Sequence, residues 1–149
     1  MATILLPNDF KDLLRLLGEN QVKYLLVGGY AVSYYGYPRA TGDMDIWVET
    51  SPLNSSCVVA TLKAFGFGST APAPEMFSQP DLVIRMGNPP LRIEILTGIS
   101  GVEFDDCWQS RETIIVDGIT VNIINLDDLK ANKKASGRLK DLNDVANLP

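Results

Sequence analysis

Apolar residues in the first third of the chain change their spacing twice, from a helical pattern to an extended one and back. Over residues 8–18 they fall on one helical face, and Asn8 is placed to cap the helix that they predict. Residues 22–27 are mostly apolar and rich in β-branched and aromatic types, as in a buried strand. Gly28-Gly29 interrupts this strand, and residues 30–35 predict a short second helix.

The middle of the chain continues the alternation. Residues 43–48 (Asp-Met-Asp-Ile-Trp-Val) begin with alternating polar and apolar side chains, which is the pattern of a half-buried strand. Residues 52–65 predict a helix that Gly66 ends. Residues 69–80 hold three of the nine prolines, and we expect them to form a surface loop.

Two hairpins and a long helix are predicted for the rest of the chain. Residues 82–86 and 91–97 flank Gly-Asn-Pro-Pro, and residues 114–116 and 119–124 flank Asp117-Gly118, a strong two-residue turn signal. Asn125 can then cap a final helix. Five apolar residues would share one face of this helix: Ala131, Ala135, Leu139, Leu142 and Ala146.

Early alternation of helices and strands, followed by hairpins, predicts a mixed sheet with helices packed mainly on one side, an α/β or α+β fold. With 149 residues, of which 46% are hydrophobic and 21% charged, we expect a single globular domain over residues 1–149. The longest uncharged apolar run, residues 24–37, is short and broken by glycines, so no membrane span or membrane partner is expected. The first residues lack the basic stretch of a secretory signal, and Cys57 and Cys107 form no close motif, which favours a cytoplasmic location.

Charge and composition narrow the chemistry. A net charge of −5 argues against binding to duplex DNA through its backbone, although a small anionic substrate needs only a few local cations. The chain contains no histidine, which excludes histidine triads, histidine bases and histidine-ligated zinc. Catalysis would depend on carboxylates, backbone amides, lysine, arginine, hydroxyls or a bound metal.

Two short motifs could carry such chemistry. Gly28 and Gly29 stand between a strand and a helix, where unpaired amides and the helix dipole attract phosphate; the alternative is a simple turn. After an interval of thirteen residues, Asp43 and Asp45 stand two apart in a strand, so both side chains point to one face, with Cα atoms about 6.5–7 Å apart. Two carboxylates so placed can converge on divalent metal; the alternative is a solvated strand face.

Together these motifs resemble the signature of the nucleotidyltransferase superfamily related to DNA polymerase β. The stretch Tyr-Gly-Tyr-Pro-Arg-Ala-Thr before the aspartates, and Lys-x-Ala-x-Gly-Arg-x-Lys-Asp-Leu-x-Asp near the C-terminus, are similar to small prokaryotic members, including minimal nucleotidyltransferases and the AbiEii-like group. The resemblance implies a nucleotidyltransferase-type fold, Mg²⁺ or Mn²⁺ as cofactor and a nucleoside triphosphate as substrate. Several relatives act in toxin–antitoxin systems, which makes a protein partner or toxin a further candidate.

The resemblance also assigns further residues. Glu94 matches the third carboxylate of the family, where many relatives have aspartate, and it could instead form a salt bridge with Arg92. Gly29 stands where many members have serine, so a phosphate-binding hydroxyl is missing. Arg39 and Thr41 precede the aspartates in a loop that should border the site, where an arginine could bind phosphate or simply be solvated.

The charged residues of the predicted C-terminal helix admit two interpretations. Lys134, Arg138 and Asp141 would form one row at helical spacing, and Lys133, Lys140 and Asp144 another. Lys133 and Arg138 could reach nucleotide phosphates, but mixed charges at this spacing more often mark a solvated face, which we favour for all of them except Lys133.

Two functions follow from the sequence. The first is metal-dependent transfer of a nucleoside monophosphate to an unknown hydroxyl acceptor on protein, RNA or a small molecule, with Asp43, Asp45 and Glu94 as metal ligands and catalytic carboxylates. The second is a catalytically weakened binding protein, such as an antitoxin or partner subunit, which the changes at Gly29 and Glu94 motivate. The sequence leaves the acceptor, the base and the oligomeric state open.

Overall fold

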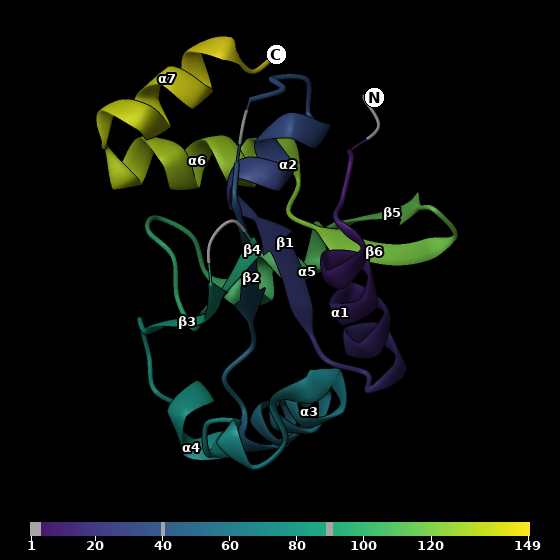
Figure 1. Cartoon of the computed structure of the whole chain (residues 1–149). Coiled ribbons are helices and arrows are strands. Elements are labelled where there is room, and N and C mark those ends of the chain that lie inside the picture. The colour runs from purple at the N-terminus through teal and green to yellow at the C-terminus, as the bar shows by residue number, and fades with distance from the viewer. Residues whose placement is uncertain (1–3, 40, 89–90) are drawn as a thin grey trace.

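A mixed sheet of six strands, in the order β3-β4-β2-β1-β6-β5, forms the centre of the computed structural model (Figure 1). The structure describes residues 4–39, 41–88 and 91–149. Strand β1 pairs antiparallel with β2 and parallel with β6, and β2 pairs parallel with β4. The strands are β1 (Tyr24–Val27), β2 (Asp43–Val48), β3 (Val83–Asn88), β4 (Leu91–Leu96), β5 (Glu112–Val116) and β6 (Ile119–Ile123).

The helices surround this sheet. Helix α1 lies across β1 and β6, α3 and α4 lie at one end of the sheet, and α6 and α7 at the other (Figure 1). The helices are α1 (Asn8–Glu19), α2 (Gly28–Tyr34), α3 (Pro52–Leu62), α4 (Pro74–Phe77), α5 (Phe104–Gln109), α6 (Leu126–Ser136) and α7 (Leu139–Asn147). Two further helical turns, η1 (Lys63–Phe67) and η2 (Gly68–Thr70), follow α3. The predicted α/β (α+β) class with a mixed sheet is confirmed.

Strand β2 separates the core from the candidate site. Met44, Ile46 and Val48 are fully buried, as expected of the apolar side of a half-buried strand. Asp43 and Asp45 alternate with them and are only partly buried. The core therefore fixes the orientation of both aspartates, because a shift of one residue in register would turn them inward.

Several predicted elements are present with small differences. The expected apolar face of α1 is buried, but Pro7 precedes the helix, the Asn8 side chain makes no capping bond, and the helix continues past Gly18 to Glu19. Helix α2 begins at Gly28 rather than at residue 30. Both hairpins form, the second with φ of 50° at Asp117, although residues 89–90 of the first predicted turn lie outside the described residues. None of the described helices is long and apolar enough to cross a membrane.

The predicted loop over residues 69–80 and the segment before β5 are corrected by the structure. Helix α4 lies within that loop and places Phe77 in the core, where none of its surface is exposed. The prolines of this segment led us to predict a loop. Pro74, however, is compatible with the first position of a helix. Helix α5 was not predicted at all, because six residues are too few to establish a helical period.

The predicted single C-terminal helix is wrong. It breaks at Gly137, whose φ of +71° is left-handed and ends α6, and α7 begins anew at Leu139. The turn reverses the expected burial. Lys133, Asp141 and Asp144 are buried, whereas the five apolar residues expected to share a buried face are exposed: Ala131, Ala135, Leu139, Leu142 and Ala146. The two charge rows predicted along one helix do not exist, since their members lie on two helices and the turn between them.

Candidate active site

Register between β2 and β4 brings the candidate carboxylates together. In this parallel pair Asp45 lies opposite Glu94, and Asp43 lies opposite Arg92. Paired positions in a sheet project to the same face, so the three carboxylates share one surface. Val27, the last residue of β1, pairs with Asp45 from the other side, which places Gly28 next to that carboxylate.

Asp45 is packed directly against the first glycine. A Cβ added to Gly28 would lie 2.1 Å from Oδ2 of Asp45, and the φ of Gly28 is +67°, so both space and backbone require glycine here. The other oxygen, Oδ1 of Asp45, is buried and has no hydrogen-bond partner among the described residues. Burial, followed by the neighbouring carboxylates of Glu94 and Asp43, raises the pKa of Asp45 to about 8. An orphaned carboxylate oxygen beside further carboxylates is the environment that a bound cation would satisfy.

The other two carboxylates are held by arginines. Asp43 accepts hydrogen bonds from Nε and Nη2 of Arg92, at 3.2 Å and 3.0 Å. Glu94 accepts one from Nε of Arg85 at 2.8 Å. The suggested pairing of Arg92 with Glu94 is therefore wrong, because the register places Arg92 across from Asp43.

These ion pairs affect the fit of a metal. Within the described part of the chain, no three acidic, cysteine or histidine side chains are grouped closely enough to hold an ion. The donor set itself, three carboxylates on one face, suits Mg²⁺, which prefers oxygen ligands. The residues therefore fit a divalent cation once the two guanidinium groups turn away.

Thr41 fills the space beside the second glycine. A Cβ added to Gly29 would lie 2.7 Å from Oγ1 of Thr41 and 3.3 Å from Nη1 of Arg39. Thr41 also donates a hydrogen bond from Oγ1 to the backbone oxygen of Asp43, at 3.2 Å. The loop after α2 thus places a hydroxyl next to Gly29, the position where the family resemblance leads us to expect a serine in many members.

A buried charge network lies beside the carboxylates. Lys133 contacts Asp141 and Asp144 at 3.0 Å each, and Arg39 donates to both oxygens of Asp144, at 2.8 Å and 2.9 Å. Burial alone would raise the pKa of Asp144, but hydrogen bonds from Arg39 and Lys133 outweigh it and lower the pKa. For Asp141, hydrogen bonds from Arg138, Ser136 and Lys133 likewise outweigh burial and lower the pKa. Helix α7 thereby holds two of the predicted phosphate ligands in place.

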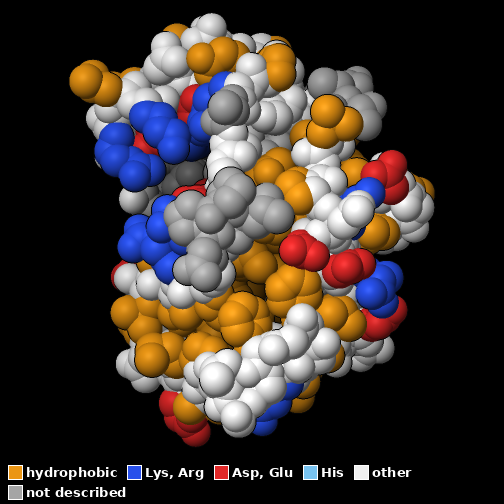
Figure 2. Space-filling model, in the orientation of Figure 1, with side chains coloured by type: hydrophobic (Ala, Val, Ile, Leu, Met, Phe, Trp, Pro, Cys, Tyr) orange, Lys and Arg blue, Asp and Glu red, His pale blue; other side chains and the backbone are white. Residues whose placement is uncertain are grey.

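All eight predicted site residues border two adjoining cavities. The central cavity, about 400 Å³, is lined by Gly28, Asp45, Glu94 and Lys133, with Arg138 and Asp141 at its α7 side. The basic cavity, about 410 Å³, shares Asp45, Glu94 and Lys133 and adds Gly29, Arg39, Thr41 and Asp43. Six basic side chains line the basic cavity: Arg39, Arg85, Arg92, Lys133, Arg138 and Lys140. Figure 2 shows Lys and Arg side chains gathered around a hollow at the left of the molecule.

The sequence missed three residues of this site. Asp141 and Asp144 were interpreted as members of surface charge rows, yet they are buried partners of Lys133. Arg85 was part of a predicted strand with no assigned role, and it binds Glu94. The only sequence signal for the two aspartates was their place in the C-terminal motif with Lys133. No sequence signal indicated Arg85, whose position opposite Glu94 follows from the register of the β3–β4 hairpin.

Comparisons with known proteins concern the fold and the family of the chain. One solved structure of similar fold is that of a "putative nucleotidyltransferase" from Thermotoga maritima, with a TM-score of 0.59, 12% identity, and coverage of 92% of this chain and 88% of that chain. At this identity the similarity shows a shared fold. No curated protein matches the sequence. The model of the family described as "nucleotidyl transferase of unknown function (DUF2204)" matches residues 7–148, and the chain therefore belongs to this family of nucleotidyl transferases.

Proposed function

We propose that this protein, acting as one domain over residues 1–149, transfers a nucleoside monophosphate from a nucleoside triphosphate to a hydroxyl acceptor, with Mg²⁺ or Mn²⁺ as cofactor. The observation that carries the proposal is the buried, unpartnered Oδ1 of Asp45, beside Glu94 and Asp43, at the edge of a cavity with six basic side chains. The carboxylates suit a divalent cation, and the basic side chains beside them suit anionic phosphate.

Each residue has a distinct role in this proposal. Asp43, Asp45 and Glu94 hold the metal, which when bound neutralises charge on the transferred phosphate. Lys133 and the arginines of the basic cavity bind the triphosphate, and the backbone at Gly28 and Gly29 can approach it closely because neither residue carries a side chain of its own. Glu94 accepts the proton of the attacking hydroxyl. The acceptor oxygen bonds to the α-phosphorus while the bond to pyrophosphate breaks.

The test is incubation of the full chain with Mg²⁺ and each α-labelled nucleoside triphosphate in turn, with and without RNA or cell lysate. We expect label to appear on an acceptor for at least one nucleotide, and calorimetry to show Mg²⁺-dependent nucleotide binding. If no nucleotide is bound with Mg²⁺ and no label is transferred, the proposal is wrong.

Thr41 offers a second prediction. If its hydroxyl stands in for the missing serine, Thr41→Val should weaken binding of the Mg²⁺–nucleotide complex by a factor of about 10 to 100, since a hydrogen bond to a charged group is worth about 1.5–3 kcal/mol. The double variant Gly29→Ser/Thr41→Gly removes both close contacts, with Oγ1 and Cβ of Thr41, and should restore most of the affinity, whereas Gly29→Ser alone should not. Calorimetric affinities of the four proteins decide this. Equal affinity in Thr41→Val and wild type would contradict the role.

The ion pairs of Asp43 and Glu94 with arginines favour an alternative, a catalytically weakened binding protein that works with a partner, such as an antitoxin or partner subunit. In that case nucleotide would bind without turnover, and the ion pairs would persist in its presence. A structure with Mg²⁺ and a non-hydrolysable nucleotide distinguishes the two, because the enzyme requires Asp43 and Glu94 to leave Arg92 and Arg85 and contact the metal.

A further inference from the structure

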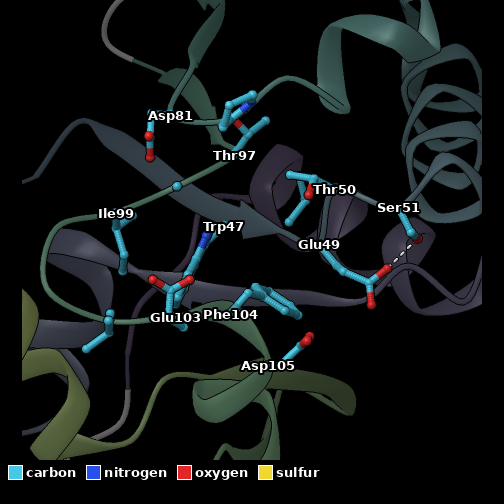
Figure 3. Close-up of a pocket in the computed structure, with 14 residues that line it drawn as sticks. Trp47, Glu49, Thr50, Ser51, Asp81, Thr97, Ile99, Glu103, Phe104 and Asp105 are labelled. Atoms are coloured by element: carbon cyan, nitrogen blue, oxygen red, sulfur yellow. Dashed lines mark hydrogen bonds between the residues drawn. The ribbon is translucent and has the colours of Figure 1, made fainter.

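An acidic cavity lies beside the candidate active site and has no role in the proposed chemistry so far. Its volume is about 570 Å³, within the range of small-molecule sites. Among the residues that the structure describes, four carboxylates and no lysine or arginine line it: Glu49, Asp81, Glu103 and Asp105. Figure 3 shows these side chains arranged around Trp47, Phe104 and Ile99.

The acidic cavity lies next to the central cavity, along the same two strands. Trp47 follows Asp45 by two positions in β2, so both side chains project to the same face. Thr97, the residue after β4, lines the acidic cavity, and Glu94 in β4 lines the central one. Ile99 lines both cavities. The acidic cavity therefore lies along the two strands that carry Asp45 and Glu94.

Trp47 gives an independent indication of a ligand. The residue is only 2% exposed, and its ring packs edge-on against Phe104 with centroids 5.1 Å apart. Its indole N–H makes no hydrogen bond to any of the described residues, although it borders the cavity. The side chain is thus almost fully buried while its N–H opens onto the cavity, where a bound molecule or water can accept a hydrogen bond from it.

The four carboxylates of the acidic cavity differ in their hydrogen bonds and ion pairs. Glu49 accepts a hydrogen bond from Ser51 (dashed in Figure 3) and is paired with Lys23 at 3.4 Å. Asp81 lies against Gly98, where an added Cβ would be 2.2 Å from Oδ1, so glycine leaves room for this carboxylate. Glu103 and Asp105 are exposed and form no ion pair within the described part of the chain. The cavity thus carries negative charge that no cation of the described chain neutralises, apart from Lys23.

We propose that the acidic cavity binds the acceptor substrate, and that the acceptor is a small organic cation with an apolar body and a hydroxyl. The cation, an ammonium or guanidinium group, is held by Glu103 and Asp105 and lies against the partly exposed ring of Phe104, beside the indole N–H of Trp47. The triphosphate is excluded by the four carboxylates and occupies the basic cavity instead. The acceptor role rests on the proposed function, whereas the cation site does not.

The first experiment measures binding without nucleotide or metal. The probe is 2-phenylethylammonium, and 2-phenylethanol is its neutral counterpart of similar shape. We expect saturable shifts of the Trp47 indole N–H resonance, which Trp108→Phe distinguishes from that of Trp108, and at least tenfold weaker binding of the alcohol. The double variant Glu103→Gln/Asp105→Asn should weaken binding of the ammonium at least tenfold, and Asp12→Asn, an exposed acid on α1, should not change it. Equal affinity for ammonium and alcohol, equal affinity in the two variants, or tighter binding of a neutral nucleoside such as adenosine would overturn the proposal.

The second experiment places this cavity relative to the metal site. With Mn²⁺ added, we expect paramagnetic broadening of the bound ammonium probe in the wild type and its loss in Asp45→Asn, with probe affinity retained. If Mn²⁺ binds and the bound probe is not broadened, the cavity is not the acceptor site. If Mn²⁺ does not bind at all while the ammonium does, the proposed transferase function fails and the organic-cation site stands.

Discussion

Asp45→Asn is expected to lower nucleotidyl transfer by about a thousandfold while leaving the protein folded. The metal that Asp45 would hold contributes several kcal/mol to stabilisation of transition-state charge, and each 1.36 kcal/mol corresponds to a factor of ten in rate. Label transfer from the preferred α-labelled nucleotide measures the change. Asp12→Asn, which removes the same charge on α1, serves as the control and should retain wild-type activity.

Although Asp45→Asn should lower activity, it should raise the free energy of unfolding when no metal is present. Because burial and neighbouring carboxylates raise the pKa of Asp45 to about 8, the unfolded chain ionises this group more readily, and the wild type loses stability as pH rises from about 4 to about 8. Asp45→Asn removes this penalty and its amide can donate to Glu94. We expect the variant to be more stable than wild type by about 1–3 kcal/mol near pH 8 in urea unfolding with a chelator present.

Added Mg²⁺ should reverse that order, since a ligand bound only by the folded state stabilises it. We expect Mg²⁺ to raise the unfolding midpoint of the wild type and to leave that of Asp45→Asn unchanged. An equal shift in both proteins, or wild-type transfer by Asp45→Asn, would contradict the role of this carboxylate.

The second large effect is expected at Asp144. Asp144→Ala should lower the free energy of unfolding by about 3–5 kcal/mol, because it removes the buried carboxylate that Arg39 and Lys133 share and leaves buried Lys133 with Asp141 as its one ion-pair partner among the described residues. Urea unfolding at pH 7 measures the loss. Arg138→Ala is the matched control in the same network; its side chain is 72% exposed, so its removal should cost at most about 1 kcal/mol.

Low pH should also weaken this network, because it protonates Asp141 and Asp144. The pKa values of Asp141 and Asp144 are lowered in the folded state, so their contribution is present above the unfolded pKa near 4 and is lost as pH falls through the lower folded values. We therefore expect the wild type to lose stability below about pH 4, and Asp144→Asn to lose less over the same range. A wild type whose stability is constant from pH 5 to pH 2 would show that the network contributes nothing.

Nucleotide binding should weaken in Asp144→Ala as well. Arg39 and Lys133 both line the basic cavity, and Asp144 holds them there through two hydrogen bonds and an ion pair. Asp144 is thus a positioning residue, and Asp144→Asn should recover part of the affinity for Mg²⁺–nucleotide by retaining hydrogen bonds. Measurement in conditions where each variant is fully folded separates this effect from the loss of stability.

Local patterns predicted the segments around the carboxylates well. Strand β2 has the expected bounds because two aspartates alternate with apolar residues over a distance that one strand spans. The turn at Asp117-Gly118 was equally clear, since few residues adopt the positive φ that both residues have. The C-terminal helix failed because Gly137 ends α6, and nothing local shows that the chain then turns back toward Lys133.

The sequence by itself determined the strand and glycine pair, the two aspartates on one face and the family resemblance, because these depend on short-range spacing and backbone preference. Tertiary structure decided which charges meet. The register of β2 with β4 paired Asp43 with Arg92, the turn at Gly137 buried Asp141 and Asp144 beside Lys133, and the loop before β2 put Thr41 beside Gly29. Such contacts join residues distant in the chain, and their energies depend on burial and geometry that no local pattern contains.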